Sequence, residues 1–186
     1  MKRLAVYCGS SFGASDVYRL GAVELGKELA KRNITLVYGG SSNGLMGVVA
    51  DTVLQEGGQV IGVIPKVLVN REISHTGLTQ LFTVDTMHER KAKMAELSDG
   101  FIVLPGGTGT LEEYFEVFTW GQIGLHKKPC GLLNIQNYYD PLIGLFDHMF
   151  QQKFLQEKFR SMILMEERPD ALIDRFNNYV PPTIKD

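Results

Sequence analysis

Cysteine is scarce in this chain of 186 residues, which contains only Cys8 and Cys130. Two cysteines, each in or directly after a strand-like apolar run, do not make the disulfide framework of a small secreted domain. We therefore expect two buried, reduced thiols in a cytoplasmic protein. The four histidines, at positions 75, 88, 126 and 148, are scattered. They form neither an H-E-x-x-H motif nor a cluster with cysteine, so the sequence predicts no metal site.

Long apolar runs and an excess of charge of one sign are also missing. No apolar stretch approaches the roughly 20 residues that a membrane-spanning helix needs. The first apolar run ends at Gly9, too early for a signal peptide, and is better interpreted as a strand. With a net charge of −2, the chain gives no electrostatic reason to expect nucleic acid or an anionic membrane as a partner.

What the chain does contain is a regular alternation of strand-like and helix-like segments. Short apolar runs predict strands at 3–8, 34–38, 59–64, 79–84, 100–104, 129–133 and 163–165. Longer periodic segments predict helices at 16–32, 47–55, 87–97, 110–121, 139–152 and 169–178. The expected fold is α/β, a single-domain Rossmann-like, doubly wound parallel sheet with helices on both faces. It would span residues 1–180 and leave a short tail at 181–186.

Three loops rich in glycine and serine each follow a predicted strand, at 9–11, 39–44 and 105–110. In open parallel sheets, ligands bind at the carboxyl ends of the strands, near the point where the strand order reverses. We therefore expect the three loops to lie along one edge of the sheet. Three such loops together favour a nucleotide-like ligand more strongly than any one of them would.

The stretch from Pro105 to Glu113, P-G-G-T-G-T-L-E-E, is the centre of this arrangement. Its glycines let backbone N–H groups approach a ligand, and the helix that follows favours an anion at its start, above all a phosphate. We expect Thr110 to be the N-cap of that helix, with Glu113 three residues on. The stretch matches neither a P-loop nor a dinucleotide-binding fingerprint. The helix dipole alone would explain either Glu112 or Glu113, but not an acidic pair beside a phosphate cradle.

The helix predicted after this turn is apolar almost all round. Its apolar residues between 111 and 123 are Leu111, Tyr114, Phe115, Val117, Phe118, Trp120 and Ile123. Such a helix is buried on more than one side. One side would cover the sheet, and the other would contact a second subunit. A fully internal helix is the alternative, but it is harder to arrange in a chain of this length, so we expect a homodimer.

Two motifs together resemble one known family. Residues 105–113 match P-G-G-x-G-T-x-x-E, and Met87-His88-Glu89-Arg90-Lys91 matches M-H-x-R-K, the two signatures of the LOG ("lonely guy") family of cytokinin-activating phosphoribohydrolases. The resemblance extends over nearly the whole chain, from 8–11 through 39–40, 44–47 and Pro65 to 119–120. It implies hydrolysis of the N-glycosidic bond of cytokinin riboside 5′-monophosphates, AMP or both. The products would be the free base, cytokinin or adenine, and ribose 5-phosphate, and a homodimer is implied as well.

The resemblance also implies roles for individual residues. Glu113 would stabilise positive charge on the ribose or activate water, and Arg90 would position Glu113 or the ligand. The substrate-binding residues would be Ser10, Gly40, Glu72, Arg90, Lys91, Gly106, Gly107, Thr108, Gly109, Thr110, Leu111, Glu112, Glu113 and Thr119. No cofactor is expected. Without the resemblance, Arg90 and Lys91 would be interpreted as part of a solvated charged helix face. His88 is expected to be structural and Glu116 a surface charge.

Two other functions remain to be weighed. A nucleotide-binding or molybdenum-cofactor carrier protein of the same fold would also bind a nucleotide but would not hydrolyse it. A lysine decarboxylase activity, a label attached to relatives, is rejected because no lysine stands in a setting suited to pyridoxal phosphate. The sequence leaves open which base is preferred and which group protonates it as it leaves.

Overall fold

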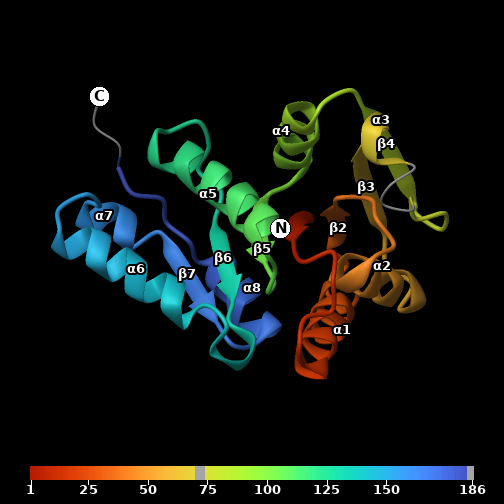
Figure 1. The fold of residues 1–186 in the computed structure, drawn as a ribbon, viewed down its shortest axis with the longest axis horizontal. Helices are drawn as coiled ribbons and strands as arrows, with labels where there is room; N and C mark the ends of the chain where they lie inside the picture. Colours follow the sequence, from red (N-terminus) through yellow and green to blue (C-terminus); the bar gives the residue numbers. More distant parts are fainter. Residues whose placement is uncertain (70–73, 184–186) are drawn as a thin grey trace.

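The computed structural model describes residues 1–69 and 74–183, and it contains one seven-stranded sheet (Figure 1). The strand order is β4-β3-β2-β1-β5-β6-β7, and every neighbouring pair is parallel. The strands are β1 (Arg3–Tyr7), β2 (Thr35–Tyr38), β3 (Val60–Pro65), β4 (Gln80–Val84), β5 (Gly100–Val103), β6 (Cys130–Leu133) and β7 (Ile163–Glu166). All seven predicted strands are confirmed, with ends that differ by at most one residue.

Helices cover both faces of this sheet, which confirms the doubly wound α/β fold (Figure 1). One face packs against α1 (Asp16–Lys31), α2 (Gly44–Gln55) and α8 (Pro169–Asn177). The other packs against α4 (Met87–Leu97), α5 (Thr108–Gln122) and α6 (Asp140–Gln151). Alternate residues of β1 enter opposite cores, because side chains alternate along a strand. Both sides of each central strand are therefore buried, which explains their continuous apolar runs.

Two predicted helix starts are wrong. Helix α2 begins at Gly44, three residues earlier than expected, and the amide of Leu45 in its first turn donates to the Gly9 carbonyl. Helix α5 begins at Thr108 with Gly107 as its N-cap, so Thr110 lies inside the first turn and is not the cap. In neither helix does a side chain cap the start. Contacts between distant loops set these boundaries, and a sequence pattern does not show them.

Three short helical segments were not predicted: α3 (Lys66–Val69), the 3-10 turn η1 (Ile135–Asn137) and α7 (Glu157–Arg160). Each is a single turn, too short to show helical periodicity. Of these, η1 lies at the carboxyl end of β6, next to the site described below.

The strand order reverses between β1 and β5, where the first half of the chain meets the second. The three glycine loops meet there, as predicted. The Gly9 amide donates to the Pro105 carbonyl at 3.1 Å, and the Gly9 carbonyl accepts from Leu45 at 3.1 Å. Gly44, at φ 55°, approaches Ser10 so closely that a Cβ on Gly44 would lie 2.3 Å from the Ser10 carbonyl carbon. This is the crevice in which such sheets bind ligands.

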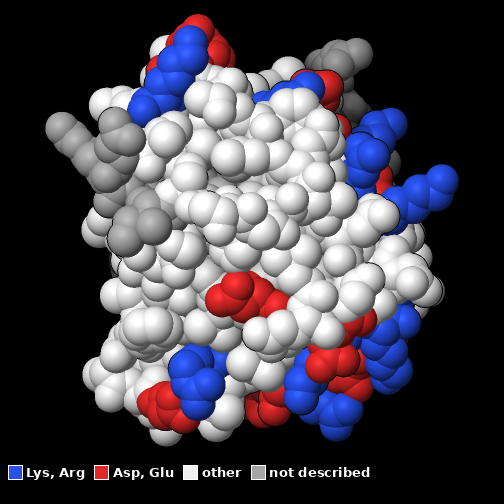
Figure 2. All heavy atoms as spheres, turned by 90° about the vertical axis from the view of Figure 1, so that its right-hand side faces the viewer, with Lys and Arg blue, Asp and Glu red and all other residues white. Residues whose placement is uncertain are grey.

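Among the described residues, no helix combines the length and the apolarity needed to cross a bilayer. On the face shown in Figure 2, lysine and arginine side chains lie beside aspartate and glutamate around the rim, and the centre is mostly uncharged. This face therefore offers no large basic patch of the kind that binds nucleic acid.

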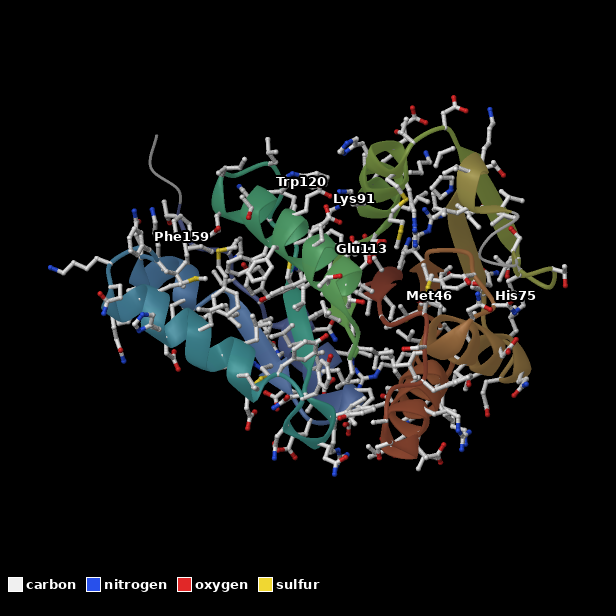
Figure 3. The ribbon with its side chains drawn as sticks, in the orientation of Figure 1. Met46, His75, Lys91, Glu113, Trp120 and Phe159 are labelled. Carbon is white, nitrogen blue, oxygen red and sulfur yellow. The ribbon has the colours of Figure 1, made fainter. Side chains whose placement is uncertain are left out.

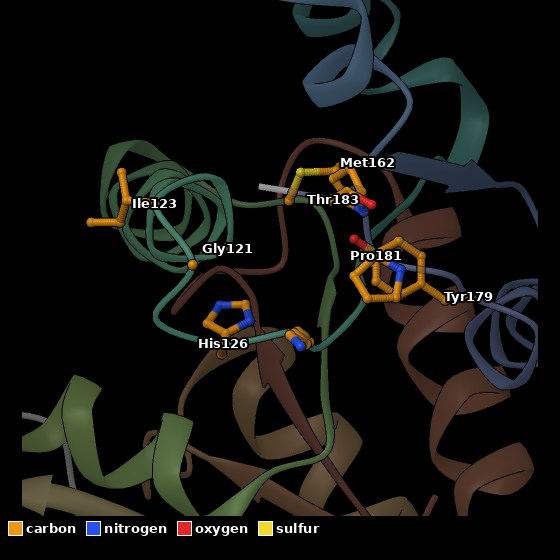
Figure 4. A pocket seen from close by; sticks show the side chains of 10 residues that line it. Gly121, Ile123, His126, Met162, Tyr179, Pro181 and Thr183 are labelled. Atoms are coloured by element: carbon orange, nitrogen blue, oxygen red, sulfur yellow. The ribbon is translucent and has the colours of Figure 1, made fainter. Parts of the chain in front are cut away.

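A pocket of about 400 Å³ lies away from this crevice, between the end of α5 and the chain that follows α8 (Figure 4). His126 lines it together with Pro181–Thr183, the described part of the predicted tail. The imidazole is fixed as a neutral group: its Nε2 donates to the Val117 carbonyl at 2.7 Å, and its Nδ1 accepts from the Lys128 amide at 3.1 Å. Burial lowers the pKa of His126 below its ordinary value.

Protonation of His126 should lower the free energy of unfolding in mild acid. Because its pKa is lower in the folded than in the unfolded chain, the unfolded state binds more protons as the pH falls below about 6.5. The free energy of unfolding should then decrease by about 1 kcal/mol, since a protonated Nδ1 no longer accepts the Lys128 hydrogen bond. Urea titrations at neutral and mildly acidic pH measure this change. His126→Gln should weaken the pH dependence, and the same change at the exposed His148 should not. Equal pH dependence in wild type and His126→Gln would contradict the assignment.

Candidate active site

A pocket of about 340 Å³ opens at the carboxyl ends of β1 and β5, at the point where the strand order reverses. Residues from four segments line it: Cys8, Gly9, Ser10, Met46, Met87, Arg90, Gly107, Thr108, Gly109, Thr110, Glu112 and Glu113. The structure thus brings together Ser10, Arg90 and most of the predicted glycine turn. Four further lining residues were not predicted as site residues, although they lie within the segments that carry the family resemblance: Cys8, Gly9, Met46 and Met87.

Arg90 and Glu113 form the charged floor of this pocket. The capping of α4 fixes the position of Arg90: Thr86 accepts from the Glu89 amide, and Glu89 accepts from the Asp85 amide. Arg90 is only 6% exposed, and its Nη2 lies 3.8 Å from Oε1 of Glu113 on α5. Within the described part of the chain, the Nε of Arg90 has no hydrogen-bond partner. A buried guanidinium with an unused donor beside a pocket is suited to hold an anionic or polar ligand.

Gly39, at the end of β2, makes room for this arginine. A Cβ on Gly39 would lie 1.9 Å from Nη2 of Arg90 and 2.4 Å from the terminal methyl of Met46. The sulfur of Met87 also lies close, 3.8 Å from Nη1 of Arg90. A glycine is therefore required at position 39 for the guanidinium to reach the pocket. The sequence pattern gave no reason to connect Gly39 with Arg90, because the two residues are far apart in the chain.

Lys91, labelled near Glu113 in Figure 3, joins α4 to α5 and is not among the residues that line the pocket. Its Nζ lies 2.5 Å from Glu112 and 3.1 Å from Glu116, which joins α4 to α5. Burial opposes the charged form of Lys91, but the hydrogen bonds to both carboxylates outweigh it and raise the pKa of the lysine. The prediction that Glu116 is a surface charge is wrong, since its side chain is only 23% exposed and is paired with Lys91. The geometry gives Lys91 a structural role.

The glycine turn between β5 and α5 contains glycines of two kinds. Gly106 is required by packing, because a Cβ there would lie 2.1 Å from the Thr110 hydroxyl and 2.8 Å from the Gly9 amide. Gly107 and Gly109 line the pocket, and a Cβ on either would meet nothing within 4 Å. Packing within the chain therefore does not explain these two glycines. Their bare backbone leaves space for a ligand at the start of α5, where helix amides and the dipole favour an anion.

The remaining predicted residues lie elsewhere. Gly40, at φ 79°, accepts a hydrogen bond from the His75 amide and does not line the pocket. Leu111 packs into the core on the α5 face, and Thr119 is exposed on the same helix. Glu72 lies outside the described residues. No group of three potential metal ligands occurs among the residues that are described.

The pKa values of Tyr7 and Cys8, at the end of β1, determine whether either side chain is ionised at neutral pH. Burial raises the pKa of the Cys8 thiol, and the nearby Glu113 carboxylate raises it further. Burial likewise raises the pKa of Tyr7, again with a contribution from Glu113. Both groups therefore stay protonated at neutral pH, and Cys8 is not a thiolate nucleophile. Two carboxylates line the pocket, Glu112 and Glu113, and Glu113 is the one that lies beside Arg90.

Comparison with known proteins now identifies the family. A family model described as "Possible lysine decarboxylase" matches residues 46–176. The chain is 49% identical over 180 residues to cytokinin riboside 5′-monophosphate phosphoribohydrolase LOG from Oryza sativa subsp. japonica, covering 97% of this chain and 74% of the rice protein. It is 48% identical over 180 residues to cytokinin riboside 5′-monophosphate phosphoribohydrolase LOG1 from Arabidopsis thaliana, covering 97% of this chain and 84% of the Arabidopsis protein.

The chain belongs to the LOG family. Solved structures share the fold of this LOG protein at lower identity. The molybdenum cofactor binding protein of Rippkaea orientalis superimposes with a TM-score of 0.71 and 20% identity, covering 96% of this chain and 97% of that one. This similarity confirms the fold, but an identity of 20% gives no information about the ligand.

Proposed function

We propose that this LOG protein hydrolyses the N-glycosidic bond of AMP or of cytokinin riboside 5′-monophosphates, releasing the base and ribose 5-phosphate. The observation that carries the proposal is the pairing of Arg90 and Glu113, 3.8 Å apart, at the floor of a pocket whose rim is the glycine turn. The names of the rice and Arabidopsis relatives, which describe this reaction, support it.

The reaction needs a carboxylate where Glu113 lies. As the bond between C1′ and the base nitrogen breaks, positive charge develops on the ribose, in an oxocarbenium-like state. Glu113 stabilises this charge and accepts a proton from the attacking water. The water oxygen bonds to C1′, the bonding electrons leave with the base nitrogen, and that nitrogen gains a proton. Arg90, which never loses its own charge, lies 3.8 Å from Glu113 and orients it.

The 5′-phosphate binds at the glycine turn in this proposal. Gly107 and Gly109 present bare backbone to the pocket at the N-terminus of α5, whose amides suit a phosphate. Phosphate binding there fixes the ribose relative to Glu113, so interactions remote from the reacting bond contribute to its cleavage.

The description of the family model as a possible lysine decarboxylase fits the site less well. Such an enzyme uses pyridoxal phosphate, which needs a lysine able to form a Schiff base. Lys91 is the buried lysine among residues 1–69 and 74–183, and its ammonium is held by Glu112 and Glu116 outside the pocket lining. This geometry favours the hydrolase over the decarboxylase.

We also propose that the active form is a cytoplasmic homodimer. On α5, Tyr114, Val117 and Phe118 are buried against the sheet. Just beyond the helix, its C-cap Ile123 is 61% exposed and Leu125 is 69% exposed. A second subunit would cover this apolar end. Both cysteines are buried free thiols, which is consistent with a reducing compartment.

Base release from AMP, followed by chromatography, tests the proposed function. We expect adenine and ribose 5-phosphate from AMP, and a kcat/KM for adenosine at least about 100-fold lower, because adenosine lacks the charge-assisted hydrogen bonds of the phosphate. N6-prenylated AMP, compared in the same assay, identifies the preferred base. Equal hydrolysis of adenosine would contradict the phosphate assignment. Binding of AMP without release of adenine would favour the carrier function.

A further inference from the structure

The segment after β6 holds an unusual backbone conformation. Gln136 and Asn137 lie consecutively in the left-handed region, at φ 50° and φ 59°. Residues with a side chain adopt this region rarely, and it costs of order 1 kcal/mol each. Two such residues in a row persist only where the surrounding structure enforces them, which is common beside functional sites.

A buried asparagine enforces this conformation. Asn134 is 3% exposed, its Oδ1 accepts from the Tyr139 amide at 2.7 Å, and its Nδ2 donates to Asp140 at 2.8 Å. Its own amide donates to the Glu166 carbonyl on β7 at 2.8 Å. The start of α6 is thereby fixed to the sheet, and the turn before the tyrosines is made by the two left-handed residues, Gln136 and Asn137.

The consequence of this turn is that two adjacent tyrosines reach the glycine turn of the active site. The Tyr138 hydroxyl donates to the Gly106 carbonyl at 2.6 Å, and the Tyr139 hydroxyl donates to the Leu104 carbonyl at 2.6 Å. The two hydroxyls therefore hold the backbone on either side of Pro105. Tyr18 of α1 supports the first of them through an edge-to-face ring contact at 5.6 Å between centroids.

The two tyrosine hydrogen bonds differ in whether the carbonyl they hold is followed by an N–H group. In a trans peptide, the C=O and N–H groups point in opposite directions. Tyr138 holds the Gly106 carbonyl and so fixes the direction of the Gly107 amide, which belongs to the same peptide unit, and Gly107 lines the pocket. The carbonyl held by Tyr139 is followed by Pro105, which has no N–H to orient.

We propose that Tyr138 is a positioning residue for phosphate binding, because its hydroxyl orients the Gly107 amide toward the ligand. The proposal rests on the proposed function, in which the glycine turn holds the 5′-phosphate. Tyr139, by contrast, stabilises the fold without a specific effect on the phosphate. The pair therefore provides its own matched control, since each substitution to phenylalanine removes one hydroxyl from one backbone carbonyl of the same turn.

Calorimetric binding of ribose 5-phosphate and of adenine to the full chain tests the proposal. We expect Tyr138→Phe to raise the Kd for ribose 5-phosphate by about 3- to 10-fold, the effect of one hydrogen bond, and to leave the Kd for adenine unchanged. Because Tyr138 is 39% exposed, the melting temperature should stay near that of the wild type. Tyr139→Phe should lower the melting temperature, because its hydrogen bond is buried, and should leave the ratio of the two Kd values unchanged.

Other results would overturn the assignment. An unchanged Kd for ribose 5-phosphate in Tyr138→Phe, or an equal loss of adenine affinity, would mean that the hydroxyl has no specific effect on the phosphate. An equal shift of the Kd ratio in Tyr139→Phe would do the same. Failure of the wild type to release adenine from AMP overturns the proposed function alone, because ribose 5-phosphate binding still tests Tyr138. A wild type that binds neither ribose 5-phosphate nor inorganic phosphate overturns both.

Discussion

Glu113→Gln should lower kcat for adenine release from AMP by about 10³-fold, within the range expected when a general base is removed. The substitution keeps the shape of the side chain, which is 12% exposed at the floor of the pocket, and removes its charge. The amide can neither accept a proton from water nor stabilise positive charge on the ribose. AMP should still bind, because the glycine turn is unchanged. Single-turnover chromatography measures the rate, and calorimetry with the variant measures the affinity.

Glu116→Gln is the matched control for this experiment. Glu116 lies one turn further along α5 and pairs with Lys91 outside the pocket lining, so its loss should change kcat by less than about tenfold. The carrier function makes a different prediction, in which Glu113→Gln changes only the affinity for the nucleotide. A Glu113→Gln variant that turns over AMP at the wild-type rate would exclude Glu113 from the reaction.

Gly39→Ala should lower kcat/KM by about 100-fold, because it moves the guanidinium of Arg90. The new Cβ would lie 1.9 Å from Nη2 of Arg90 and 2.4 Å from the methyl of Met46, and both atoms are the far ends of flexible side chains. The chain can therefore fold around the substitution, but Arg90 must leave its position beside Glu113. Steady-state kinetics with AMP, together with urea denaturation, separate the catalytic effect from any loss of stability.

A second glycine supplies the control for this substitution. A Cβ on Gly144, in α6, meets nothing within 4 Å, so Gly144→Ala should leave turnover unchanged and increase stability by up to about 1 kcal/mol. If Gly39→Ala folds and retains full activity, Arg90 does not need its observed position for the reaction. Loss of activity that simply follows loss of folded protein would also argue against the proposed contact.

The fold could be predicted from the sequence because its signals are local. The central strands are continuous apolar runs, and breakers such as Pro105 mark their ends. The three glycine loops could be placed at one edge because every strand is parallel. The starts of α2 and α5 could not be predicted, because backbone contacts from Gly9 and an N-cap without a side chain, Gly107, determine them.

Site residues that belong to a sequence motif could be predicted. Site residues that depend on a contact between distant parts of the chain could not. Arg90 and Glu113 were predicted from their motifs, and the structure brings them together. The space that Gly39 leaves for Arg90, and the pairing of Glu116 with Lys91, depend on packing between elements far apart in the sequence. Tyr138 and Tyr139 gave no local signal, because their hydroxyls act on a turn more than 30 residues away.

The pairing of β1 with β5 has a consequence for how the protein acquires activity during folding. Register partners such as Ala5 and Phe101 are separated by most of the first half of the chain, so the crevice between these strands depends on a contact of high sequence separation. Closing such a long loop is slow compared with forming a helix or a local βαβ unit. During synthesis, β1 to β4 can assemble before β5 leaves the ribosome, but the floor of the pocket cannot. In the proposed function, nucleotide binding therefore requires that the two halves of the sheet have joined, and not merely that each has folded.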